Sequence, residues 1–221
     1  MRPHPGYRII TTIACAVLFA AFILFLLVSL SLTIIRPIYL LTFRDAKISG
    51  TPLTIAKQLR FGVWGVCAVG DLFPDEPLCF GPQLGYAVPA YLAEVVQVSQ
   101  TVLDTVQKAL LVVLVLHPVV AGLALLNLFF SIMLAIFSTT QALAVINLVI
   151  AVITAIFASV SMGIDIALIL VARSKLKDLD QFSFAVDFGN AVWIVVAGVA
   201  LNWTAVVLLS ARACYCLGIN R

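Results

Sequence analysis

The sequence predicts an all-α membrane protein, a bundle of four transmembrane helices that carries a small β-rich cap. Of its 221 residues, 63% are hydrophobic and only 10% are charged, and the mean hydropathy is +1.18. Soluble domains are nearer half apolar and a quarter charged, so this composition excludes a water-soluble globule. The apolar residues also gather in four runs, each long enough to supply the roughly 20 residues that cross a hydrocarbon core.

The four predicted spans are residues 9–35, 109–137, 142–172 and 188–209. The first run lies near the N-terminus, but it is longer than the roughly 7–15 apolar residues of a signal peptide, so we interpret it as a retained helix. The second contains Pro118, which removes one backbone hydrogen bond and is expected to kink the helix. The short, uncharged connection between the second and third spans predicts an antiparallel hairpin.

Residues 36–107 form the longest polar interval and are predicted to fold as an extramembrane cap. Short runs of β-forming residues between turn residues indicate a small sheet. These runs are Arg36–Phe43, Thr51–Ala56 and Phe61–Cys67. From Leu92 to Leu110 the apolar residues recur at three- and four-residue spacings, which predicts an amphipathic helix continuous with the second span. No internal repeat is visible, so residues 1–221 are predicted to form a single domain.

The charge of the chain argues against nucleic acid as a partner, because a net charge of +3 without basic blocks offers little to a polyanion. The sequence has two histidines and lacks a phosphate-binding loop, a nucleophile elbow and zinc-ligand spacing. We therefore predict that the protein is not an enzyme, and we expect no catalytic residues, cofactor or metal. The expected partners are membrane lipids and either another polytopic membrane protein or the same protein.

Two cysteines, Cys67 and Cys79, are the only ones in a predicted loop. They are either two unrelated reduced thiols or a disulfide that closes a short ring. A disulfide persists only on the oxidising side of a membrane. An even number of spans places both termini on one side, and the short flanking segments carry too similar a positive charge to choose that side. If the two cysteines are bridged, both termini are cytoplasmic.

Two motifs resemble those of a known family. The string Phe61-Gly62-Val63-Trp64-Gly65-Val66-Cys67, followed by Cys79 and then Leu84-Gly85-Tyr86, resembles the fungal membrane family that joins the pH-response regulator palI to the Sur-type cortical-patch proteins. The string His117-Pro118-Val119-Val120-Ala121-Gly122-Leu123 is similar to the His-Pro…Ala-Gly-Leu stretch of the palI branch. Span number and loop order agree as well, so the resemblance covers most of the chain.

The cap is also similar to the broader claudin pattern, in which Trp-x-x-Cys is followed by a second cysteine. Trp64 and Cys67 fit that pattern, and the gap to Cys79 is slightly longer than in claudins. The upstream claudin tryptophan is missing, with Phe43 at about its place. This departure indicates a claudin-like fold in a protein that is not a claudin.

The resemblance implies a fungal, multi-pass plasma-membrane protein with cytoplasmic termini and an extracellular cap held by a Cys67–Cys79 disulfide. In the palI branch, such a protein helps a separate seven-span alkaline-pH sensor reach or stay at the cell surface. The alternative is a Sur-type organiser that self-associates in cortical patches (eisosomes). A third reading, a transporter or channel subunit, is supported only by Asp165 and the kink at Pro118.

Within the cap, we interpret Trp64 as a packing anchor in preference to a ligand site. Gly62, Gly65 and Gly85 are expected to permit tight turns or close strand approach, and Tyr86 belongs to the same motif.

Within the spans, His117 is expected to hydrogen-bond a backbone carbonyl freed at the kink, with titration as the less favoured reading. Asp165 is the only acid in a span, and we expect it to reach the interface or pair with Arg173. Partner contact or ion passage is the alternative for this residue.

Small residues at four-residue spacings predict close helix packing, either within the bundle or against another protein. They are Gly122, Ala151, Ala155, Ser159, Gly163 and Gly198. The sequon Asn202-Trp203-Thr204 lies inside the fourth span and is expected to be unmodified. Cys214 and Cys216 follow that span, where they are either palmitoylation sites or plain reduced thiols.

Overall fold

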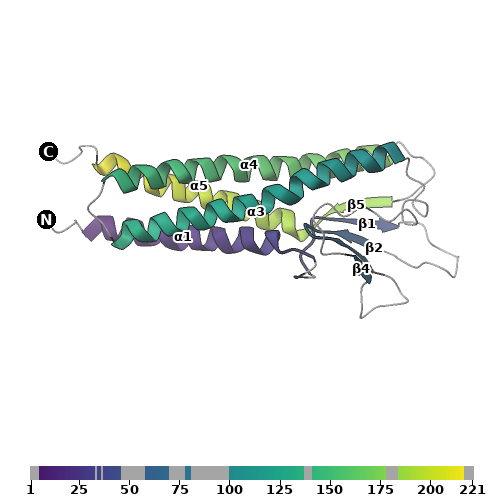
Figure 1. Ribbon diagram of the computed structural model, residues 1–221, viewed down its shortest axis with the longest axis horizontal. Helices are drawn as coiled ribbons and strands as arrows, with labels where there is room; N and C mark the ends of the chain where they lie inside the picture. The colour runs from purple at the N-terminus through teal and green to yellow at the C-terminus, as the bar shows by residue number, and fades with distance from the viewer. Residues whose placement is uncertain are drawn as a thin grey trace. The chain divides into compact units, whose positions relative to one another are not determined.

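The apolar runs of the chain form four long helices in the computed structural model (Figure 1). The helices are α1 (Pro5–Ser29), α3 (Gln100–Ile136), α4 (Gln141–Lys177) and α5 (Asn190–Cys216). Each contains a stretch long and apolar enough to cross a membrane: Ile9–Ser29, Val115–Ile136, Gln141–Val171 and Asn190–Ala213. The predicted bundle of four spans with a small sheet is confirmed.

The structure describes residues 5–32, 34–35, 37–45, 58–69, 78–80, 100–136, 141–177 and 184–216. Backbone contacts divide the chain into two units. Unit 1 comprises Met1–Leu26, Pro118–Met162 and Ile194–Arg221. Unit 2 comprises Leu27–His117 and Gly163–Trp193. Each unit contains parts of all four long helices, and unit 2 also contains the sheet. That the chain forms a single domain stays a prediction.

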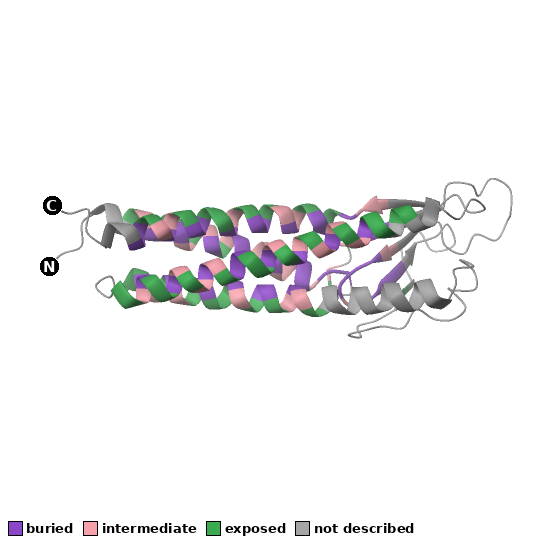
Figure 2. Cartoon of the chain, turned by 90° about the horizontal axis from the view of Figure 1, so that it is seen from above, coloured by how far each residue is buried: buried purple, intermediate pink, exposed green. Residues whose placement is uncertain are grey.

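Buried and exposed residues alternate in bands along each long helix (Figure 2). Many of the exposed residues are large and apolar, whereas the buried ones include most of the small residues and several polar ones. On α4, for example, Val149, Ile156 and Val160 are exposed, whereas Asn147 and Thr154 are fully buried. A bilayer solvates apolar side chains on the outside but leaves polar groups no water, so this inverted pattern is the one expected of helices in lipid.

The buried residues of each helix follow a seven-residue repeat, and we call this line of residues the seam of the helix. On α4 the seam alternates steps of three and four residues through Ala144, Asn147, Ala151, Thr154, Ala158, Ser161 and Asp165. The same alternation gives Thr11, Ala14, Leu18, Ala21, Phe25 and Val28 on α1, His117, Val120, Ala124, Asn127, Ser131 and Leu134 on α3, and Ala191, Val195, Gly198, Asn202, Ala205, Leu209 and Arg212 on α5. A sustained seven-residue repeat is typical of helices that wind around one another with a left-handed supercoil.

Small residues bring the helices of unit 1 close together. Gly198 of α5 lies against Phe25 of α1, since a Cβ added at Gly198 would be 2.8 Å from Phe25 Cε1. The core around these helices is accordingly rich in alanine; it includes Ala14, Leu18, Leu128, Leu134, Ala144, Ala151, Ala155, Ala205 and Leu209. Dispersion between closely approaching backbones, more than the expulsion of water, is what holds helices together in lipid.

Hydrogen bonds between helices of unit 1 supplement this packing. Cys15 Sγ of α1 lies 3.1 Å from Ser131 Oγ of α3. The Asn202 amide donates to the Ala151 carbonyl at 3.5 Å. Near the chain ends, Arg212 donates to Thr11 Oγ1. This last contact places the N-terminal part of α1 beside the C-terminal part of α5, as an even number of spans requires.

Unit 2 contains a five-stranded antiparallel sheet in the order β4-β3-β2-β1-β5 (Figure 1). The strands are β1 (Leu41–Asp45), β2 (Gln58–Phe61), β3 (Val66–Val69), β4 (Leu78–Phe80) and β5 (Phe184–Phe188). β1 and β3 overlap two of the predicted strand runs. The third run, Thr51–Ala56, lies outside the described residues.

β5 corrects the sequence interpretation, which treated residues 173–187 as a loop and began the fourth span at Phe188. α4 instead continues to Lys177, and the chain then pairs with β1 before α5 begins at Asn190. The strand has the period-two pattern of a sheet, with Phe184, Val186 and Phe188 alternating with smaller or charged residues. Phe188 also fits the apolar run that follows, which conceals the pattern of the strand.

The end of α1 is a second correction. The apolar run was predicted to stay helical to residue 35, but the helix ends at Ser29. Leu32 then adopts a φ of 70°, an uncommon conformation for a side chain of this size. The Leu32 N–H donates to the Ile35 carbonyl at 3.1 Å, which closes a turn. The helix therefore ends inside the apolar run, and the turn that follows it contacts the sheet.

The packing of unit 1 predicts opposite responses at two glycines. Gly198→Ala forces a methyl group against Phe25, and overpacking of this kind costs about 1–3 kcal/mol. Its thermal unfolding midpoint in detergent should fall. Gly122→Ala is the matched control, because nothing lies within 4 Å of an added Cβ there; its midpoint should stay level or rise. Equal midpoints for the two variants would contradict the close approach of α1 and α5.

Candidate functional site

The motif that the sequence analysis singled out is a β-hairpin. Phe61, the last residue of β2, pairs with Val66, the first of β3. The four residues between them form a tight turn, in which the Gly62 N–H donates to the Gly65 carbonyl at 3.0 Å. The Val63 N–H at the tip donates to Ser31 Oγ at 3.1 Å, just beyond α1. The hairpin turn is thus joined to the end of the first span.

Glycine is required at position 62 because the hairpin turn lies so close to the segment that follows α1. A Cβ at position 62 would lie 2.2 Å from Leu32 Cβ, which is far inside the contact distance of two non-bonded carbon atoms. Leu32 is itself fully buried beneath the hairpin turn. Only a residue without a side chain lets the two backbones approach to this extent.

Trp64 makes the second contact of the hairpin turn. Its indole Nε1 donates to the backbone carbonyl of Ser29, the last residue of α1. The last carbonyls of a helix have no hydrogen-bond partner within the helix. Trp64 therefore supplies a hydrogen bond that the Ser29 carbonyl would otherwise lack. The side chain therefore anchors the sheet to α1.

A comparable joint ties the sheet to the start of α5. Asn190 accepts a hydrogen bond from the Tyr39 N–H at 3.0 Å and donates to the Pro37 carbonyl at 2.7 Å. Beside it, the Gly189 N–H donates to the Leu40 carbonyl at 2.8 Å. The sequence contains a signal for this joint that the predicted spans do not use, because an asparagine directly before an apolar run is a recognised sign of a helix start.

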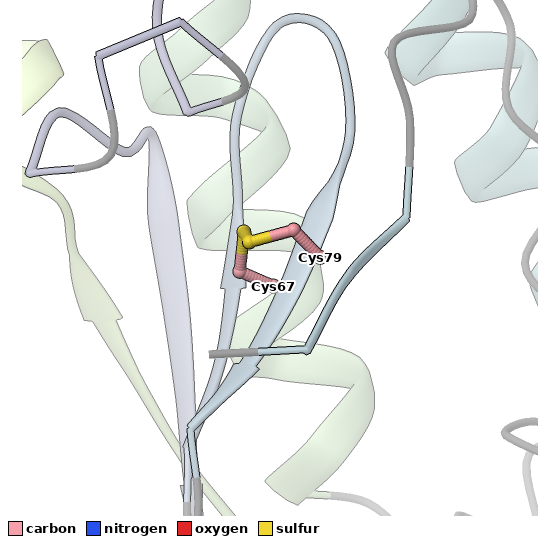
Figure 3. Close-up of a disulfide and its surroundings, with 2 residues drawn as sticks. All are labelled: Cys67 and Cys79. Carbon is pink, nitrogen blue, oxygen red and sulfur yellow. A yellow bond between two sulfur atoms is a disulfide. The ribbon is translucent and has the colours of Figure 1, made fainter. Parts of the chain in front are cut away.

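A disulfide joins Cys67 to Cys79, which lie directly opposite each other on β3 and β4 (Figure 3). Cys67 is buried, whereas Cys79 is exposed. This observation decides between the two alternatives that the sequence left open. In the chain-entropy model, closing a ring of this size stabilises the fold by roughly 3 kcal/mol.

A histidine and an aspartate meet inside the span region of unit 2. His117 Nε2 of α3 lies 3.2 Å from Asp165 Oδ2 of α4, and the two side chains are only 4% and 2% exposed. The expected pairing of Asp165 with Arg173 is wrong. Arg173 instead lies 3.7 Å from Asp187 at the surface, with its guanidinium over the Phe188 ring. Asp165 is too deeply buried in the α4 seam to reach that arginine.

A model of the SUR7/PalI family matches residues 10–207. The chain belongs to the SUR7/PalI family. The match extends over all five described strands and nearly all of the four spans. No curated protein matches the chain.

The two motifs of this SUR7/PalI protein occupy different structural settings. The cap motif supplies the hairpin turn and one half of the disulfide. In the second motif, His117 faces the interior and contacts Asp165. Gly122, five residues later, is exposed on α3. Pro118 lies within α3, which stays helical through it.

Five of the six small residues that the spacing singles out in this SUR7/PalI protein separate into two groups, and the sixth, Ser159, is half-buried. Ala151, Ala155 and Gly198 are buried within the bundle. Gly122 and Gly163 face outward, and an added Cβ at either would meet nothing within 4 Å. Outward-facing glycines do nothing for the packing of the bundle itself.

Several predicted residues lie beyond what the structure describes. Gly85 and Tyr86 fall in a segment outside the described residues, and the side chains of Cys214 and Cys216 do as well. In the parts of the chain that are described, no three His, Cys, Asp or Glu residues group as metal ligands. The absence of enzyme activity and of a metal stays a prediction.

The disulfide predicts a simple pattern of defects. Cys67→Ser and Cys79→Ser should each lower the thermal unfolding midpoint by the same amount, equivalent to about 3 kcal/mol. The double variant should be no worse than either single variant, because the second substitution removes nothing further. Surface delivery in cells should follow the same order. Additive losses would show that the two cysteines act separately.

Proposed function

We propose that this protein is a non-enzymatic plasma-membrane scaffold that helps a multi-span alkaline-pH sensor reach or stay at the cell surface. The observation that carries the proposal is the SUR7/PalI family match over residues 10–207. Within it, the stretch from His117 to Gly122 is similar to the palI branch. The proposed partner is therefore another polytopic membrane protein of a fungal cell.

The proposed mechanism is lateral binding of the sensor to helix faces that look into the lipid. Gly122 on α3 and Gly163 on α4 support it, because small residues on an exposed helix let a second helix come close. The sheet, joined to the ends of α1 and α5, adds a rigid surface outside the membrane.

A second candidate is a Sur-type organiser of cortical patches, since the family model spans both branches. It would use the same outward glycines to bind further copies of itself. The two functions predict different losses when the protein is absent. The first predicts that the sensor leaves the cell surface, and the second predicts that the patches disperse.

The proposal places both termini in the cytoplasm and the disulfide outside the cell. A membrane-impermeant thiol probe should then label Cys214 and Cys216 only after permeabilisation. Labelling in intact cells would invert the proposed topology. A Cys214→Ser, Cys216→Ser variant controls for signal from Cys15, the free cysteine of α1.

A strain that lacks the protein tests the function directly. It should grow poorly at alkaline pH, and imaging should show the pH sensor lost from the surface. Normal growth with the sensor in place but with dispersed patches would instead favour the organiser.

Variants of the outward glycines test the mechanism. Gly122→Leu with Gly163→Leu should reach the membrane yet reproduce the loss of the sensor, because bulk at both positions keeps a partner helix away. The matched control is Val119→Leu with Val160→Leu, at exposed positions that already carry a branched side chain. If the glycine variant restores the null strain as well as the wild type does, these faces do not bind the sensor.

A further inference from the structure

Three asparagines share the interior of unit 1, one from each of three helices. Asn127 belongs to α3, Asn147 to α4 and Asn202 to α5, and all three side chains are fully buried. Asn127 and Asn202 lie near the middle of their membrane spans, Val115–Ile136 and Asn190–Ala213. A carboxamide group loses its water when it is buried at this depth, and the burial is costly unless new hydrogen bonds replace the lost ones.

The protein itself supplies few of these hydrogen bonds. Each carboxamide has an oxygen that accepts and an amide nitrogen that donates. Within the described parts of the chain, neither Oδ1 nor Nδ2 of Asn127 and Asn147 has a hydrogen-bond partner. Asn202 Nδ2 reaches the Ala151 carbonyl at 3.5 Å, which is long for a hydrogen bond, and Asn202 Oδ1 has no partner among the described residues. Both donors and acceptors are therefore left open in one part of the bundle.

The three carboxamides lie at neighbouring levels of the bundle. Only residues 137–140 separate the end of α3 from the start of α4, so these two points are at the same end of the bundle. At about 1.5 Å of rise per residue, Asn127 is about 14 Å from that end along α3, and Asn147 is about 9 Å from it along α4. The hydrogen bond to Ala151 places Asn202 one turn further along α4 than Asn147, at about the level of Asn127. All three therefore fall within about one helical turn, or about 5.4 Å, of one another.

Small residues flank each asparagine on its seam, one turn away in both directions. They are Ala124 and Ser131 on α3, Ala144 and Ala151 on α4, and Gly198 and Ala205 on α5. Five of the six have no polar atom in the side chain, and the sixth, Ser131, lies with its Oγ 3.1 Å from Cys15 Sγ. The seams thus offer the carboxamides few groups to bond, and their short side chains leave room for a small molecule.

The charge of unit 1 decides which small molecule fits. The sequence of this unit, residues 1–26, 118–162 and 194–221, contains no aspartate or glutamate. A metal cation among neutral carboxamides would therefore lack a carboxylate as counter-charge, which is costly at this depth. An anion would face three open carboxamide oxygens, which repel it. Water is neutral and both donates and accepts hydrogen bonds, so it matches a set of open donors and acceptors.

We propose that Asn127, Asn147 and Asn202 bind water at the centre of the bundle, and that this water joins α3, α4 and α5. Each bound molecule donates to the oxygen of one carboxamide and accepts from the nitrogen of another, so the asparagines are satisfied through water. A bridge of this kind is nearly as favourable as a direct hydrogen bond. The site fixes how the three helices are rotated relative to one another, and the inference holds whichever cellular role is correct.

Water-edited magnetic resonance of the full-length protein in lipid bilayers tests for the water directly. The chain has five asparagines, so isotope-labelled asparagine gives five side-chain amide signals, and single leucine variants assign them. Magnetisation from water should reach Asn127, Asn147 and Asn202 as well as the exposed Asn190, which is the positive control. In Asn147→Leu, transfer to Asn127 should fall, because the water loses one of its partners. Transfer that reaches Asn190 but none of the three buried carboxamides would overturn the proposal.

The stability of the leucine variants is an independent test, because leucine resembles asparagine in shape but forms no side-chain hydrogen bond. Carboxamides without any partner would destabilise the bundle, so each leucine would then raise the thermal unfolding midpoint. With bound water, each single leucine variant should lower the midpoint, because the other two asparagines and the water are left short of a partner. The triple variant should lose less than the sum of the three single losses, because the coupled partners are removed together.

Thr204→Val is the matched control for the removal of a polar group from α5. Thr204 is exposed, and its hydroxyl donates within its own helix to the Ala200 carbonyl at 2.8 Å. Its midpoint should stay at the wild-type value. Midpoints at or above that value in the single leucine variants would overturn the proposal. Should these variants fail to fold, the wild type decides: at least four of its five amide signals, those of the site and of Asn190, should receive magnetisation from water.

Discussion

Hydrocarbon offers a polypeptide no hydrogen bonds, and this constraint governs how every helix of the protein is oriented. Large apolar side chains face outward, where lipid solvates them as well as a protein interior does. The interior combines alanine and glycine, which let the backbones approach closely, with leucine, valine and a few polar residues. Asn127, Asn147 and Asn202 illustrate the rule, since each is fully buried on the seam of its helix. The same arrangement encloses the side chains of His117 and Asp165, which lie 3.2 Å apart.

The sheet depends on the helices through two joints made largely of backbone atoms. At one, the hairpin turn contacts the end of α1 through Val63 and Trp64; at the other, Asn190 contacts the segment before β1. Both include a glycine at which a side chain would collide with the opposing backbone or with its Cβ, namely Gly62 and Gly189. Backbone contacts of this kind tolerate little change in geometry, whereas the lipid-facing side chains are free to vary. The family motif of the cap therefore supplies the residues that connect the sheet to the end of α1.

The sequence carried enough to predict the four spans, the cap, the disulfide pair and the family, because length, hydropathy and short motifs are local properties. Contacts that depend on how one helix is rotated relative to another could not be predicted from the sequence. Asp165 was matched with Arg173, its nearest cation along α4, when the contact was with His117 on another helix. The signal that could have found the pair is the seven-residue seam, on which both residues fall. β5 was missed for a related reason: Phe188 fits both a strand and the apolar run that follows.

The position of β1 has a consequence for how the protein is made. This strand is in the interior of the sheet, between β2 and β5, yet its two neighbours come from opposite parts of the chain. β2 emerges from the ribosome shortly after β1, but β5 follows only after α3 and α4. Throughout the insertion of these two spans, one edge of β1 has unpaired backbone groups, which attract other extended chains. The nascent protein thus passes through a stage in which β1 is open to pairing with the wrong strand.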